Sequence, residues 1–192
     1  KQIMVECIEP TLAELQKRGI DYRGVLYAGL MLTKTGPRLL EYNIRFGDPE
    51  CQILMMRLQG DLAKVLKACA DGELKSSGMI DELSMKDECA LTVVISAKGY
   101  PENPEKGAVI TGIDEANKVE GVKVFHAGTS EVNGQLVVNG GRVLNVTAIG
   151  SSVKIARERA YEACELIKFD GMHYRKDIAY QAHYTSAEFP KS

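Results

Sequence analysis

Apolar side chains recur every three or four residues near the start of the chain, which is the spacing of a helix with one buried face. This pattern predicts a helix over residues 3–18, in which Pro10 forms a kink or a new first turn. A second helix is expected to begin at Asp48-Pro49-Glu50, with Asp48 as the N-cap and a proline at the first helical position. The dipeptide Gly60-Asp61 then interrupts the pattern and starts a further helix over residues 62–70.

Two strands are predicted between these helices. Residues 25–32 are nearly all apolar, which is typical of a strand that is buried on both faces. The segment 33–37 contains Gly and Pro and reads as a turn. A second strand is expected over residues 38–46, so that the two strands form a hairpin.

Beyond residue 88 the pattern changes to short apolar runs separated by turn residues. Asn133-Gly134 lies between two of these runs and is a strong signal for a two-residue hairpin. A final helix is expected from Ser151 or Ser152, as its N-cap, to about Lys168. The predicted strands of this part are residues 89–97, 108–112, 122–129, 135–138 and 142–149.

Together these elements predict an α+β fold in two parts. The polar stretch 71–87, which includes Ser76-Ser77-Gly78, is the predicted linker. The first part then covers residues 1–70 and the second, strand-rich part covers residues 88–185, followed by a tail over residues 186–192.

Charge and cysteine content narrow the class of protein. The 192 residues include 24 Lys and Arg and 26 Asp and Glu, so the net charge is −2, which argues against binding nucleic acid or an anionic membrane through overall charge. Five cysteines without a C-x-x-C motif favour reduced thiols and a cytoplasmic protein over a disulfide framework or a cysteine zinc site. No apolar run approaches the roughly 18 residues of a transmembrane helix. The chain begins without Met inside a predicted helix, so we expect it to be a piece of a longer polypeptide.

The second predicted strand carries the clearest candidate chemistry. Alternation places Leu40 and other apolar residues on one face, and Glu41, Asn43 and Arg45 on the other. A carboxylate and an amide two residues apart on one face can converge on a cation, and Mg²⁺ suits such hard oxygen ligands when nucleotide phosphates complete its shell. Arg45 could face a phosphoryl group with its planar donor fork. An ordinary solvent-facing strand remains the alternative interpretation at this point.

Several motifs occur in a fixed order along almost the whole chain. They are Gly24-Val25-Leu26-Tyr27-Ala28-Gly29-Leu30-Met31, Leu40-Glu41-Tyr42-Asn43-Ile44-Arg45-Phe46-Gly47-Asp48-Pro49-Glu50, Gly99-Tyr100-Pro101, Val124-Phe125-His126-Ala127-Gly128-Thr129, Gly140-Gly141-Arg142-Val143-Leu144, Val146-Thr147-Ala148 and Tyr174-Arg175-Lys176-Asp177-Ile178. This series resembles the C-terminal half of the phosphoribosylamine–glycine ligase family, within the ATP-grasp superfamily. The resemblance implies that residues 1–70 are the last portion of an ATP-grasp domain and that residues 88–185 form a small, barrel-like domain.

The resemblance also implies an activity. Members of this family join glycine to 5-phosphoribosylamine at the expense of ATP, through glycyl phosphate, and release glycinamide ribonucleotide, ADP and phosphate in purine biosynthesis. The family is roughly twice as long as this chain, within the range expected for several domains. The missing N-terminal half would carry the amine-substrate domain, a phosphate-covering loop and the ATP-anchoring lysine, so the fragment alone is expected to be inactive.

The family's site residues carry over to matching positions only. Glu41 and Asn43 match the metal-binding pair, which would hold Mg²⁺ or Mn²⁺, and Arg45 matches a catalytic arginine of the superfamily. The superfamily commonly places another metal-binding carboxylate one strand earlier, whereas residues 27–31 contain no acid here. The remaining candidates are Leu40 for ATP, and Asp48, Glu50, Arg142 and Lys176 for the substrates.

Two other classes of function stay open on the sequence alone. Another ATP-grasp carboxylate–amine ligase would share the Glu-x-Asn-x-Arg strand but not the Gly-Asp-Pro-Glu segment that follows it. A non-catalytic module that binds a nucleotide or a partner protein is the second alternative. We expect the protein to have no nucleic-acid or membrane partner.

Overall fold

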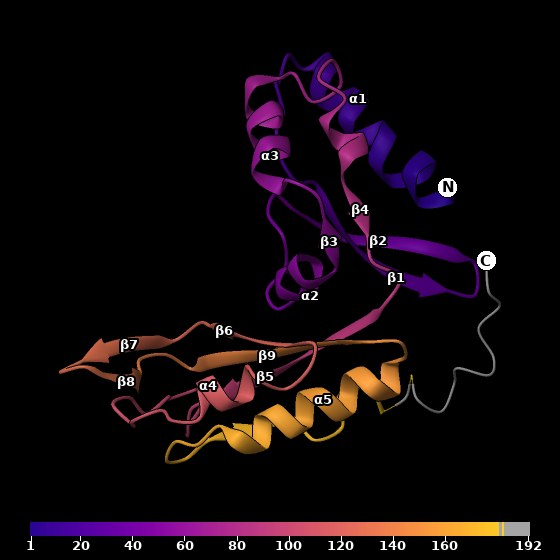
Figure 1. Ribbon diagram of the computed structural model, residues 1–192. Helices are drawn as coiled ribbons and strands as arrows, with labels where there is room; N and C mark the ends of the chain where they lie inside the picture. Colours follow the sequence, from indigo (N-terminus) through magenta and orange to yellow (C-terminus); the bar gives the residue numbers. More distant parts are fainter. Residues whose placement is uncertain (181, 183–192) are drawn as a thin grey trace. The chain divides into compact units, whose positions relative to one another are not determined.

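The computed structural model describes residues 1–180 and residue 182, and its elements are shown in Figure 1. The chain divides into two compact units, each described by itself. Unit 1 comprises residues 1–50 and 58–84, and unit 2 comprises residues 51–57 and the chain from residue 85 onward. Among the described residues, no helix is both long enough and apolar enough to cross a membrane.

Unit 1 is built on a helix and a hairpin. A π-helical turn, η1 (Met4–Ile8), continues into α1 (Glu9–Lys17), and Pro10 lies in the first turn of α1 as predicted. Strands β1 (Tyr27–Thr33) and β2 (Gly36–Asn43) form the predicted antiparallel hairpin. The Tyr42 hydroxyl donates to the Cys7 carbonyl oxygen at 2.6 Å and lies 2.6 Å from the Thr11 hydroxyl, which ties the hairpin to the helical segment.

The rest of unit 1 follows the sequence-based expectation for its helix. Helix α3 (Leu62–Asp71) begins after Asp61, whose carboxylate accepts a hydrogen bond from the Lys64 amide at 3.1 Å, so the predicted recapping is confirmed. The polar stretch 71–87 contains more structure than a linker would. It includes η2 (Met79–Glu82) and β4 (Ser84–Met85), and β4 pairs with β3 (Leu58–Gln59).

Unit 2 centres on an antiparallel sheet in the order β10 (His173–Tyr174), β5 (Cys89–Ser96), β9 (Arg142–Gly150) and β6 (Val122–His126). Helix α5 packs along one face of this sheet (Figure 1), and its N-cap is Ser152, which accepts a hydrogen bond from the Ile155 amide at 3.3 Å. The inward-facing side chains of the sheet and helix form the core, in which Val93, Ile95 and Val146 are fully buried. The elements are α2 (Glu50–Arg57, of which Glu50 belongs to unit 1), β5 (Cys89–Ser96), α4 (Ile113–Ala116), β6 (Val122–His126), β7 (Thr129–Val132), β8 (Gln135–Val138), β9 (Arg142–Gly150), α5 (Val153–Leu166) and β10 (His173–Tyr174).

The α+β class is confirmed, and so is the β7–β8 hairpin, whose turn residues Asn133 and Gly134 both have positive φ, at 52° and 76°. Two details predicted for the strands of unit 2 are wrong. Residues 108–112 form isolated bridges from Val109 and Thr111 rather than a strand. The predicted strand 122–129 is divided between β6 and β7. Over the described residues, β10 and β6 lie at the edges of the four-stranded sheet.

All five cysteines are free, as the sequence suggested. The predicted tail 186–192 lies outside the described residues.

Candidate functional site

The predicted pair of oxygen ligands comes together on β2. Glu41 lies opposite Gly29 of β1, and Asn43 lies opposite Tyr27, so both side chains project from the same face of the hairpin. The Asn43 Nδ2 donates a hydrogen bond to the Glu41 Oε1 at 3.1 Å. Glu41 is exposed and Asn43 is half-buried, so the carboxylate is accessible from solution.

A β-bulge at Leu40 sets which side chains share this face. Leu39 pairs with Leu30 and Glu41 pairs with the adjacent Gly29, so Leu40 is the extra residue of β2. The Leu40 side chain is 65% exposed. The bulge also brings Arg38, which is opposite Met31, onto the same face as Glu41. Simple alternation along β2 would have placed Arg38 on the other face, and we therefore missed it.

Arg45 does not belong to the strand. The prediction extended the strand to residue 46, but β2 ends at Asn43 and the chain bends at residues 44–45. The Arg45 side chain is exposed, and its Nη1 donates to the carbonyl oxygen of neighbouring Phe46 at 3.1 Å. Strand alternation therefore does not place Arg45 on the face of Glu41 and Asn43.

The segment after the strand is a tight turn. Helix α2 begins at Glu50, one residue later than expected, and Asp48 and Pro49 form a turn joined by a cis peptide bond. Asp48 therefore does not take the N-cap position. The Glu50 carboxylate folds back against buried Gly47 and occupies the space that a Cβ there would need. Asp48 and Glu50 are both exposed.

The donor chemistry of Glu41 and Asn43 fits one hard cation with an incomplete protein shell. Among the described residues, no group of three His, Cys, Asp or Glu side chains could hold a metal ion. A carboxylate and an amide on one face supply two oxygen ligands once the Asn43 amide rotates to exchange its Nδ2 for its Oδ1. Mg²⁺ typically uses few protein ligands and completes its octahedron with water and phosphate oxygens.

The two remaining candidates, Arg142 and Lys176, belong to unit 2. Arg142 is the first residue of β9, is exposed, and lies opposite Ser96 of β5. Lys176 is exposed in the segment that follows β10. The candidates Glu41, Asn43 and Arg45 belong instead to unit 1.

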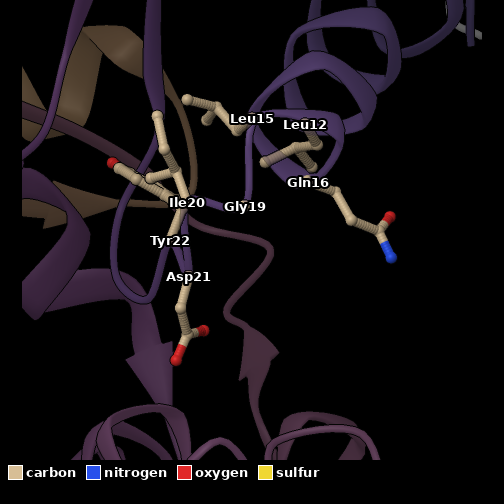
Figure 2. Close-up of a pocket in the computed structure, with 7 residues that line it drawn as sticks. All are labelled: Leu12, Leu15, Gln16, Gly19, Ile20, Asp21 and Tyr22. Atoms are coloured by element: carbon tan, nitrogen blue, oxygen red, sulfur yellow. The ribbon is translucent and has the colours of Figure 1, made fainter.

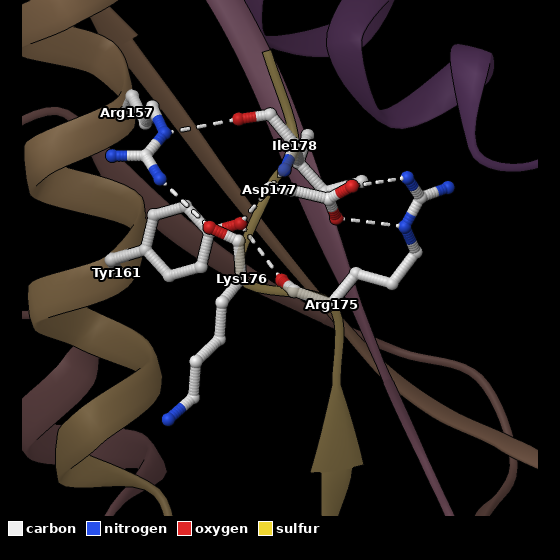
Figure 3. A network of polar contacts seen from close by, with 6 residues as sticks. All are labelled: Arg157, Tyr161, Arg175, Lys176, Asp177 and Ile178. Carbon is white, nitrogen blue, oxygen red and sulfur yellow. Dashed lines mark hydrogen bonds and ion pairs between the residues drawn. The ribbon is translucent and has the colours of Figure 1, made fainter. Parts of the chain in front are cut away.

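Two side chains of α5 hold the backbone around Lys176 (Figure 3). Arg157 donates from Nη2 to the Lys176 carbonyl oxygen at 2.7 Å and from Nε to the Ile178 carbonyl oxygen at 3.0 Å. The Tyr161 hydroxyl donates to the Arg175 carbonyl oxygen at 2.7 Å and accepts from the Ile178 amide at 3.1 Å, and the Arg157 guanidinium stacks 4.6 Å from the centre of its ring. We call these two residues the α5 clamp; their i, i+4 spacing was the sequence signal that we did not use.

The charged side chains beside Lys176 neutralise each other. Arg175 binds Asp177 through two hydrogen bonds, from Nε at 2.9 Å and from Nη2 at 2.7 Å. This pairing lowers the pKa of the Asp177 carboxyl and raises that of the Arg175 guanidinium. In Figure 3 the Lys176 ammonium points away from this ion pair.

Two pockets of unit 1 lie elsewhere in that unit. The larger one, of about 480 Å³, surrounds the end of α1 and includes Leu12, Leu15 and Ile20 (Figure 2). A neighbouring pocket of about 310 Å³ shares Leu15 and Ile20 and extends to Arg18. Neither pocket is lined by Glu41, Asn43 or Arg45, so both are separate from the candidate site.

The family indicated by the sequence motifs is also found when the chain is compared with models of known protein families and with known proteins. Residues 1–51 match the model of the phosphoribosylglycinamide synthetase ATP-grasp (A) domain, and residues 90–181 match that of the phosphoribosylglycinamide synthetase C domain. A phosphoribosylamine–glycine ligase of Mesorhizobium japonicum is 51% identical over 182 residues, which cover 95% of this chain and 42% of that protein. One from Brucella melitensis is 50% identical, with 93% of this chain and 41% of the relative covered.

A solved structure gives the same result. The crystal structure of phosphoribosylamine–glycine ligase from Thermotoga maritima is 37% identical and superimposes with a TM-score of 0.75, covering 92% of this chain and 42% of that one. The chain therefore spans about two fifths of the length of the relatives it matches. The match to the ATP-grasp (A) domain precedes the match to the C domain along the chain, and the relatives are similar over nearly all of the chain. The chain belongs to the phosphoribosylamine–glycine ligase family and corresponds to the C-terminal part of its members.

Proposed function

We propose that this chain is the C-terminal part of a cytoplasmic ligase that joins glycine to 5-phosphoribosylamine with ATP, forming glycinamide ribonucleotide in purine biosynthesis. The observation that carries the proposal is the Glu41–Asn43 pair, which the β1–β2 hairpin presents together on an accessible face. The family membership supplies the reaction, in which a carboxylate is first phosphorylated and an amine then displaces phosphate.

Glu41 and Asn43 would hold Mg²⁺, or Mn²⁺ in its place, in this reaction. The bound cation neutralises phosphate charge on ATP and so supports phosphoryl transfer to the glycine carboxylate. Before the cation binds, the Asn43 amide donates its 3.1 Å hydrogen bond to the Glu41 carboxylate, and this bond keeps the two side chains together. Leu40, which is exposed next to Glu41, offers an apolar contact to the nucleotide.

Other charged residues of the chain would bind the remaining groups of the reaction. Arg45, whose guanidinium is exposed, neutralises charge on the transferring phosphoryl group. The carboxylates of Asp48 and Glu50 orient the amine. The phosphate of 5-phosphoribosylamine is held by Arg142 and by Lys176, whose backbone the α5 clamp fixes.

The remaining portion of the same polypeptide is the proposed partner of unit 1. Over this unit only three hydrophobic side chains are buried, Cys7, Val65 and Ala68. In contrast, Leu32 and Ile44 are 77% and 75% exposed. So much exposed apolar surface on one small unit is typical of a surface that a neighbour covers.

A chimera tests the proposed function. This chain would replace the matching C-terminal part of the Mesorhizobium japonicum relative, to which it is 51% identical. We expect the chimera to form ADP only when glycine and 5-phosphoribosylamine are both present, and to release glycinamide ribonucleotide. A chimera that melts cooperatively but forms no product would contradict the proposal.

A further inference from the structure

Gly29 is a glycine whose backbone does not require one. Its φ lies outside the left-handed region that favours glycine, and it lies inside β1, where a glycine usually costs stability. A glycine at such a position often marks a place that another group approaches closely. The approaching group here is the side chain of its cross-strand partner, Glu41.

The contact is close enough to control where the Glu41 side chain lies. A Cβ added to Gly29 would lie 3.1 Å from Glu41 Cγ and 3.7 Å from Glu41 Oε1. The former distance is shorter than an ordinary carbon–carbon contact of about 3.5–4.0 Å. Because Glu41 also accepts the hydrogen bond from Asn43, moving its side chain would break up the pair.

The β-bulge fixes this arrangement in register. Leu40 is the extra residue, so the pairing changes between Leu30–Leu39 and Gly29–Glu41. Bulges bend a strand locally and re-aim its side chains, and they are frequent beside active sites. Here the bulge brings Glu41 directly opposite the one position of β1 that has no side chain.

We propose that Gly29 is a positioning residue for the metal-binding pair: its missing side chain gives Glu41 the room to lie across β1 and meet Asn43. The metal part of this inference rests on the proposed function, whereas the contact between Glu41 and Asn43 does not. Glu41 is the only acidic residue of β1 and β2, so its carboxylate is the only one that this strand pair can offer to a cation.

A double-mutant cycle tests the positioning role without metal. Gly29→Ala, Glu41→Ala and the double variant are made in this chain, with Ala28→Gly, on the opposite face of β1, as the control for a change of glycine content. The side-chain amide resonances of Asn43 are followed by NMR, and melting temperatures are measured alongside. We expect Gly29→Ala to shift the Asn43 signals toward those of Glu41→Ala, and to lower the melting temperature only when Glu41 is present. If Gly29→Ala alone does not fold, the double variant should.

Equal costs of Gly29→Ala with and without Glu41, or unchanged Asn43 signals in the Gly29→Ala variant, would overturn the inference. A separate titration with Mn²⁺ alone then addresses the metal. We expect Mn²⁺ to broaden the backbone signals of Glu41 and Asn43, and Gly29→Ala to weaken this binding roughly tenfold, as the loss of an orienting partner typically does. Absence of broadening in the unmodified chain would contradict the proposed metal site, while the metal-free cycle still decides the role of Gly29.

Discussion

At the scale of single residues, one irregularity in an otherwise regular hairpin changes which side chains share the face of Glu41 and Asn43. Without the bulge at Leu40, strict alternation would still place Glu41 and Asn43 on one face, but Arg38 would face the other way. With the bulge, the guanidinium of Arg38, the carboxylate of Glu41 and the amide of Asn43 lie on one face of the hairpin. The Glu41 carboxylate is exposed, so its charge contributes little to folding, and function is the stronger explanation for its position.

The substitution Glu41→Gln distinguishes a role of Glu41 in metal binding from a role in folding. The amide keeps the shape and can still accept the hydrogen bond from Asn43, but it lacks the negative charge that a divalent cation requires. We expect the chimera carrying Glu41→Gln to need far more Mg²⁺ for activity while its melting temperature stays within about 2 °C, since surface changes typically alter stability by under about 0.5 kcal/mol. A magnesium titration against Glu131→Gln, an exposed glutamate of β7, provides the comparison. Unchanged magnesium dependence would argue against a ligand role.

Arg45→Lys asks whether the arginine acts through its planar fork or only through its charge. If Arg45 contacts the phosphoryl group in the transition state, lysine should not replace it, because an ammonium lacks the paired donors. We expect kcat of the chimera to fall on the order of a hundredfold, with a smaller change in KM for ATP. Arg38→Lys, on the face of Glu41, is the matched control. A lysine variant of Arg45 with near-normal kcat would show that charge alone suffices.

At the scale of elements, the sequence predicted the helix caps and the turn that depend on neighbouring residues. It did not predict the strand ends that depend on pairing with a distant strand. Caps such as Asp61 and Ser152, and the turn at Asn133-Gly134, were recovered because their signals lie within three or four residues. The end of β2 at Asn43 was missed because a strand ends where its partner does, and β1 begins at Tyr27, opposite Asn43. Residues 108–112 were mistaken for a strand because their apolar pattern suits one, although they form only isolated bridges.

The α5 clamp is a second case in which distant residues determine local structure. Tyr161→Phe removes one hydroxyl that serves both the Arg175 carbonyl and the Ile178 amide. We expect a loss of about 1–2 kcal/mol in the free energy of unfolding, because two hydrogen bonds disappear, one exposed and one partly buried. Urea unfolding measures this loss, and hydrogen exchange at the Ile178 amide should quicken. Tyr174→Phe is the control, since the Tyr174 ring lies 6.2 Å from that of Tyr161 and its hydroxyl has no hydrogen bond to the part of the chain that the structure describes. Equal losses in both variants would mean that the two hydrogen bonds of the Tyr161 hydroxyl do not account for the loss.

At the scale of the whole molecule, the two units differ in how completely they bury apolar surface. Unit 2 has a continuous core between its sheet and α5, whereas unit 1 buries three hydrophobic side chains and leaves much of its hairpin exposed. The candidate metal ligands lie in unit 1. The unit that carries the proposed metal ligands is thus the unit that buries fewer hydrophobic side chains.

Binding of Mg-ATP by the 192-residue chain tests this dependence directly. The chain covers 42% of its Mesorhizobium relative, and of the proposed nucleotide contacts it supplies only Leu40, Glu41, Asn43 and Arg45, all of which are accessible or half-buried rather than enclosed. Four such groups cannot surround a nucleotide, and small-molecule sites typically bury most of their ligand. We therefore expect isothermal titration calorimetry to give a dissociation constant weaker than about 1 mM, or less than about 4 kcal/mol of binding free energy. The chimera, titrated under the same conditions, should bind much more tightly. Micromolar binding by the chain alone would mean that these residues already form a complete nucleotide site, and the proposed need for the remaining polypeptide would be wrong.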